Sequence, residues 1–84
     1  MRAYESIQEA LGDLKSRGFS IDFTIKRDSI YIEPMNLGFE SGEFHIIEYY
    51  RFRGISDVEN YSMVYAIETN SGFKGVLIGE LKAF

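Results

Sequence analysis

The sequence predicts an α+β domain in which one N-terminal helix packs on an antiparallel sheet of about five strands. Apolar residues recur at helical spacing near the N-terminus, whereas most of the remaining chain alternates apolar and polar residues with period two. The chain has 84 residues, which is enough for one domain over residues 1–84 and leaves no room for a second.

The predicted helix runs from about residue 7 to residue 17. Ser6 and Glu9 match a capping box, and Gly18 supplies the left-handed residue that commonly ends a helix. A helix of about three turns is marginal alone in water, so it needs a sheet to lie on. The apolar stripe that would face this sheet consists of Ile7, Ala10, Leu11 and Leu14.

Alternation and turn residues divide the rest of the chain into strands. A front hairpin covers residues 19–26 and 30–32, and Pro34 then opens an irregular connection over residues 33–43. Three further strands are expected at residues 44–53, 62–69 and 73–81, with a loop at 54–61 and a tight turn at 70–72. Gly75 and Gly79 inside the last strand predict a bulge or a close approach by another backbone.

Composition excludes several classes of protein. The absence of cysteine excludes a disulfide scaffold and thiolate zinc sites, and it fits the cytoplasm. The N-terminus lacks the apolar region of a signal peptide, and no apolar run could span a bilayer. We therefore expect a soluble cytoplasmic protein without a membrane partner. The net charge of −4 makes nucleic acid an unfavourable partner.

No group of residues matches a catalytic, metal-binding or phosphate-binding motif. His45 is the only histidine, with Glu43 beside it, and its spacing to the nearby carboxylates favours an exposed strand-end histidine over a metal or proton-transfer site. No serine lies in a Gly-x-Ser-x-Gly motif. We therefore expect no catalytic residue, no metal and no cofactor. An enzyme would need His45 or a carboxylate in a cleft with a perturbed pKa.

Short segments over most of the chain resemble a known family. The segments are residues 4–11, 17–19, 22–23, 36–37, 43–44, 50–54, 57, 65–67 and 74–77. They resemble a family of short, uncharacterised bacterial proteins, many of which carry the label phosphoribosylpyrophosphate synthetase. The resemblance implies a fold and a bacterial family without an activity. A true synthetase is several times longer and has adjacent acidic residues in its ribose-phosphate loop, and no two acidic residues are adjacent here.

The sheet face opposite the helix is the most informative feature. A helix about 16 Å long cannot cover a five-stranded sheet about 20 Å wide. Nevertheless both faces of the back strands carry apolar residues, with Ile47 and Tyr49 on the face opposite to Phe44, Ile46, Tyr50 and Phe52. A second copy in a symmetric homodimer is the simplest cover. The alternative is that tyrosines tolerate exposure and the connection over residues 33–43 folds across the gap.

These observations favour a small non-enzymatic interaction or regulatory module that self-associates through its sheet. The alternative is a domain that binds a small molecule in a pocket lined by tyrosines and arginine. In either case the candidate interface or ligand-binding residues are Tyr31, Tyr49, Arg51 and Tyr65. Residues 49–53 also interleave aromatics with arginines, as single-stranded nucleic acid platforms do, but alternation turns the aromatics at 50 and 52 toward the core.

Overall fold

The structure is a computed structural model that describes residues 4–27, 29–53 and 61–79. The predicted loop at 54–61 lies almost entirely outside these residues, as does the end of the predicted last strand. Two short 3-10 helices, η1 (Glu33–Met35) and η2 (Ser41–Glu43), flank the third strand. The other elements are α1 (Ile7–Ser16), β1 (Ile21–Lys26), β2 (Ser29–Ile32), β3 (Leu37–Phe39), β4 (Phe44–Arg53), β5 (Tyr61–Thr69) and β6 (Lys74–Ile78).

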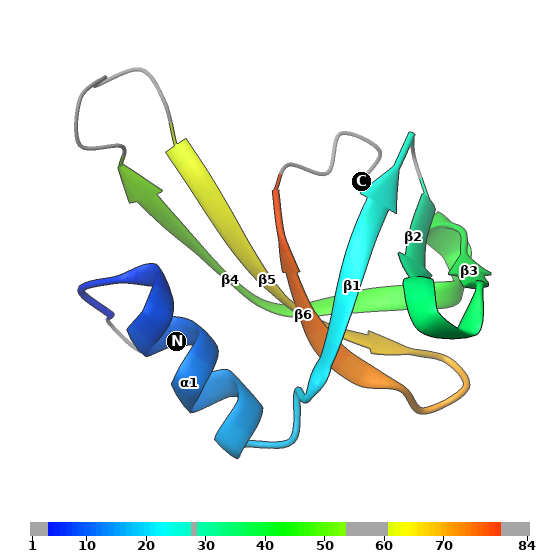
Figure 1. Cartoon of the computed structure of the whole chain (residues 1–84), viewed down its shortest axis with the longest axis horizontal. Helices are drawn as coiled ribbons and strands as arrows, with labels where there is room; N and C mark the ends of the chain where they lie inside the picture. The colour runs from blue at the N-terminus through cyan, green and yellow to red at the C-terminus, as the bar shows by residue number, and fades with distance from the viewer. Residues whose placement is uncertain (1–3, 28, 54–60, 80–84) are drawn as a thin grey trace.

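The strands form one six-stranded mixed sheet in the order β3-β2-β1-β6-β5-β4, with α1 on one side (Figure 1). The α+β class is confirmed. β3 adds a strand within the expected irregular connection and pairs with β2. The last strand of the β4–β5–β6 meander lies beside β1, the first strand of the chain. This pair, β1–β6, is parallel, which differs from the antiparallel sheet that the sequence predicts. The pairs β1–β2, β4–β5 and β5–β6 are antiparallel, as predicted, and the added pair β2–β3 is antiparallel as well.

The helix follows the N-cap Ser6 and ends before Gly18, as its sequence predicts, with the Ser6 half of the capping box formed. The Ser6 hydroxyl accepts the Glu9 backbone N–H at 3.1 Å. At the other end Gly18 has φ 106°. The N–H groups of Gly18 and Phe19 donate to the carbonyls of Lys15 and Leu14, which is the Schellman arrangement. The chain therefore leaves α1 at a fixed angle and enters β1 almost immediately.

Gly75 lies where another backbone approaches closely, as predicted. It pairs with Ile21 across the parallel β1–β6 contact. A Cβ atom on Gly75 would lie 2.2 Å from the Ile21 carbonyl oxygen, so no larger residue fits without moving a central strand. Gly79 follows β6 with φ 146° and is not inside the strand.

The sheet buries a different core on each face. The helix-side core consists of Leu14, Phe19, Tyr50, Val64, Ala66 and Val76. The hairpin-side core consists of Phe23, Ile30, Ile32, Phe39, Phe44, Tyr65, Ile67 and Leu77. The second core is closed by the chain itself, since β1, β2 and β3 contribute to it together with β4, β5 and β6 (Figure 1).

Phe39 of β3 shows how the second face is covered. Its ring packs edge-on against Phe23 at 6.3 Å between centroids and lies 6.0 Å from the ring of Phe73. The connection over residues 33–43 therefore covers part of this face, through Phe39 and the partly buried Leu37. Part of β4 stays exposed, with Ile47 at 48% and Tyr49 at 54%.

A β-bulge in β4 changes which side chains share a face. The pairing with β5 shifts between Ile46 and Glu48. Phe44 lies in the hairpin-side core, whereas Tyr50 lies in the helix-side core. The assignment of Phe44, Ile46, Tyr50 and Phe52 to one face was wrong, because the extra residue at the bulge reverses the alternation beyond it.

Leu14→Ala should destabilise the domain by about 2–5 kcal/mol, because Leu14 is fully buried and its loss leaves a cavity under the helix. Urea unfolding followed by circular dichroism measures the difference. Leu11→Ala, one turn earlier and only partly buried, is the control and should cost less. Equal unfolding midpoints for Leu14→Ala and the parent protein would contradict the packing of α1 on the sheet.

Candidate functional site

The bulge brings a carboxylate of β4 to the end of α1. Glu48 lies on the helix side of the sheet, where the Arg17 guanidinium donates to both of its carboxylate oxygens, one of these hydrogen bonds measuring 3.1 Å. Tyr50 donates its hydroxyl to the same carboxylate. Tyr4 donates to Asp13, whose carboxylate lies 3.6 Å from the Arg17 guanidinium. We call these five residues the Arg17 cluster.

The electrostatics of the Arg17 cluster are those of a closed, satisfied network. The hydrogen bonds from Arg17 and Tyr50 lower the pKa of Glu48 from 4.5 to about 2, and the contact with Glu48 raises the pKa of Arg17. Burial and the hydrogen bond to Asp13 raise the pKa of Tyr4 to about 12. Arg17 and Glu48 are 26% and 16% exposed at their side chains, so the cluster is partly screened from solvent. The cluster therefore joins α1 to β4, and we interpret it as a contact that stabilises the fold.

Three of the four candidate residues lie on the opposite face of β4 and β5. Tyr49 pairs with Tyr65, and Arg51 pairs with Met63. Tyr49 and Arg51 are exposed, whereas Tyr65 is only 3% exposed and belongs to the hairpin-side core. The structure therefore leaves Tyr49 and Arg51 accessible and buries Tyr65 across the strand from Tyr49.

β4 is an edge strand of the sheet. Its ten residues pair with β5 on one side, and no strand among the described residues pairs with the other. The exposed Ile47 and Tyr49 lie on this strand at the bulge and just after it. The edge, Ile47, Tyr49 and Arg51 together form an accessible surface that we call the β4 edge.

Tyr31 lies apart from the other three candidates. It is on β2, and its neighbours Ile30 and Ile32 point into the hairpin-side core, so Tyr31 faces the other side of the sheet. There it lines an open depression at the end of the β1–β2 hairpin. The four candidate residues therefore belong to two separate surfaces.

His45 is exposed on β4, as expected for a strand-end histidine. Its partner on β5 is Glu68, and the neighbouring Glu43 accepts the Glu40 backbone N–H. Within residues 4–27, 29–53 and 61–79, no three histidine or acidic side chains are grouped as metal ligands. The same ranges hold no helix of the length and apolar character that crossing a membrane requires.

Comparison with known proteins gives no relatives: the chain matches no family model, no curated protein and no solved structure. The resemblance to short bacterial proteins stays a prediction.

Sequence reasoning did not find the Arg17 cluster. No pattern in the sequence assigned a joint role to Arg17 and Glu48. The one available signal is the doubled Ile46–Ile47, since two adjacent apolar residues in an alternating strand can mark a bulge. The partner of Glu48 lies 31 residues away, and no local pattern could identify it.

Glu48→Gln should destabilise the domain by about 1.5–3 kcal/mol at neutral pH, because it removes charge-assisted hydrogen bonds. The pKa of Glu48 is lower in the folded state, so its stabilising effect is present above 4.5 and is lost as the pH falls toward 2. The difference in unfolding free energy between parent and variant should therefore shrink over that interval, as measured by urea unfolding at several pH values.

Glu68→Gln is the matched control, since it removes the same charge from the same face of the neighbouring strand without touching Arg17. It should cost less than Glu48→Gln at neutral pH. A difference between the parent and Glu48→Gln that stays constant down to a pH of about 2 would show that the ion pair does not set the pKa of Glu48.

Proposed function

We propose that this domain is a non-enzymatic interaction module that self-associates through the β4 edge. The proposal is supported by a strand edge that no described strand pairs with, together with exposed apolar side chains on the same strand. An edge strand offers a row of backbone N–H and C=O groups that a second strand can pair with. Pairing of two copies about a twofold axis would extend the sheet and cover Ile47 and Tyr49.

The sequence of β4 leaves this edge open to pairing. Protein edges are commonly blocked by lysine, by proline or by shortness of the strand. β4 is ten residues long and contains neither lysine nor proline. The bulge between Ile46 and Glu48 is its one interruption, so the continuous segment for pairing is residues 48–53.

Charge selects the register of such a pairing. Like charges directly opposite each other destabilise a sheet, which disfavours the arrangement with Arg51 opposite Arg51 of the second copy. Placing Tyr50 on the twofold axis keeps most of residues 48–53 paired and sets Tyr49 opposite Arg51 of the second copy. Each interface then gains two arginine–tyrosine contacts of the cation–π type.

Tyr49→Lys should abolish self-association without unfolding the domain, because Tyr49 is 54% exposed and the new lysine would lie opposite an arginine. Sedimentation equilibrium at several protein concentrations measures the result. Met35→Lys is the control, since Met35 is 57% exposed and lies on η1, which is not part of β4. It should associate like the parent protein. A parent chain that is monomeric at high micromolar concentration would refute self-association.

Tyr49→Glu separates this register from other modes of association. In the proposed pairing the new carboxylate faces Arg51 of the second copy, so this variant should keep the dimer that Tyr49→Lys loses. A purely apolar contact at Tyr49 would be lost in both variants. Loss of the dimer in both, with normal circular dichroism, would reject the proposed register.

A further inference from the structure

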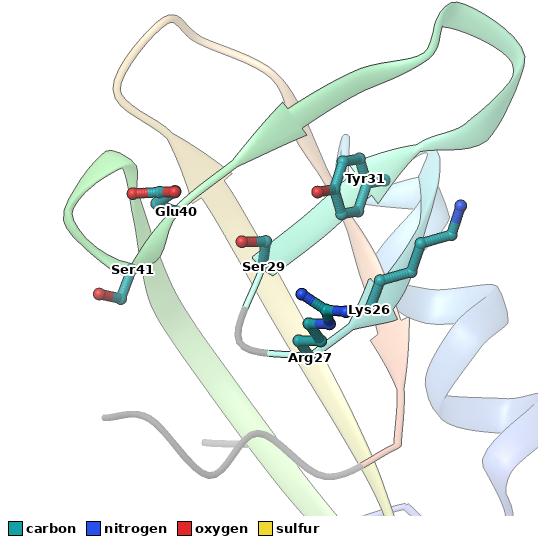
Figure 2. Close-up of a pocket in the computed structure, with 6 residues that line it drawn as sticks. All are labelled: Lys26, Arg27, Ser29, Tyr31, Glu40 and Ser41. Carbon is teal, nitrogen blue, oxygen red and sulfur yellow. The ribbon is translucent and has the colours of Figure 1, made fainter.

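An open depression of about 630 Å³ lies at the end of the β1–β2 hairpin. Figure 2 shows Lys26 and Arg27 on one side of it, Ser29 and Tyr31 between, and Glu40 and Ser41 on the other side. The lining side chains are all polar or amphipathic: they offer two cations, one carboxylate and three hydroxyl groups. None of them belongs to β4, so the depression is independent of the proposed self-association.

Tyr31 is held in place as one wall of the depression. Its ring lies against Gly38 of β3, where a Cβ atom would come within 2.4 Å of a ring carbon. The Lys26 ammonium lies 5.4 Å from the centroid of the same ring and 3.5 Å from a Glu33 carboxylate oxygen. Glycine at position 38 thus makes room for the tyrosine, and the Lys26 charge is already engaged by its neighbours.

Arg27 occupies a backbone conformation that arginine rarely adopts. Its φ is 59°, in the left-handed region that asparagine and glycine usually take in a two-residue hairpin turn. A non-glycine residue held there costs stability, and such residues are enriched at functional sites. The conformation sets the Arg27 side chain at the mouth of the depression (Figure 2).

Arg27 and Glu40 face the same depression but do not neutralise each other. Both side chains are exposed, and within the part of the chain that the structure describes no ion pair joins them. A simple dianion such as phosphate would be attracted by Arg27 and repelled by Glu40. A ligand with one charge of each sign would satisfy both groups at once.

We propose that this depression binds a small zwitterion of the α-amino acid type. The Arg27 guanidinium presents the fork of N–H donors that fits a carboxylate, and the Glu40 carboxylate accepts the ammonium group. The hydroxyls of Ser29 and Tyr31 lie between these charges, the hydroxyl of Ser41 lies on the Glu40 side, and all three can hydrogen-bond polar atoms of the ligand.

The test is a titration followed by two-dimensional amide NMR of the labelled full chain. The probes are the standard amino acids with uncharged side chains, each added at about 10 mM, which exceeds the millimolar Kd expected for a small ligand at an open site. At least one should shift the amides of Arg27, Ser29 and Ser41. Its C-terminal amide and its N-acetyl derivative, which each lack one charge, should bind at least about tenfold more weakly.

Arg27→Asn is the decisive variant, because asparagine tolerates the left-handed conformation and removes only the charge and the fork. It should lose binding while its melting temperature stays the same or rises. Glu40→Gln should weaken binding, whereas the control Glu5→Gln, exposed ahead of α1, should not. The proposal is overturned if no probe shifts these amides, if Arg27→Asn binds as the parent does, or if the N-acetyl derivative binds as tightly as the zwitterion.

Discussion

The contact between Arg17 and Glu48 determines how α1 docks on the edge strand β4. It links the last turn of α1 to the edge strand β4, and Tyr50 completes it by donating to the same carboxylate. The contact exists because the bulge after Ile46 turns Glu48 toward the helix. The same bulge turns Tyr49 away from the helix, so one inserted residue sets both the docking of α1 and the exposure of the β4 edge.

Local patterns predicted the parts of this fold that depend on local physics. The caps at Ser6 and Gly18, the close approach at Gly75 and the extent of β4 all follow from residue type and spacing. The parallel pairing of β1 with β6 and the three-residue strand β3 could not be predicted in this way. The first joins segments far apart in the chain, and the second is too short to show alternation.

The candidate surface could be predicted only in part. The alternation of apolar and polar residues indicates which side chains are buried, but it does not indicate on which face of the sheet each one is buried. Phe44 and Tyr50 are both buried, and the sequence therefore placed them together although the bulge sends them to different cores. Tyr65 is covered because β1–β3 fold over its face, and Tyr31 lines a separate depression. What alternation did identify is the exposed pair of Tyr49 and Arg51, on which the proposed self-association depends.

Amide hydrogen exchange of β4 at low and high protein concentration tests this account most directly. Outward-facing backbone N–H groups of an edge strand exchange readily in a monomer, and they are protected when a second strand pairs with them. If β4 pairs with a second copy, protection within residues 48–53 rises with concentration, whereas protection of β1 and β6 in the centre of the sheet does not change. Concentration-independent exchange throughout β4, in a sample that sedimentation shows to be associated, would contradict pairing through this edge.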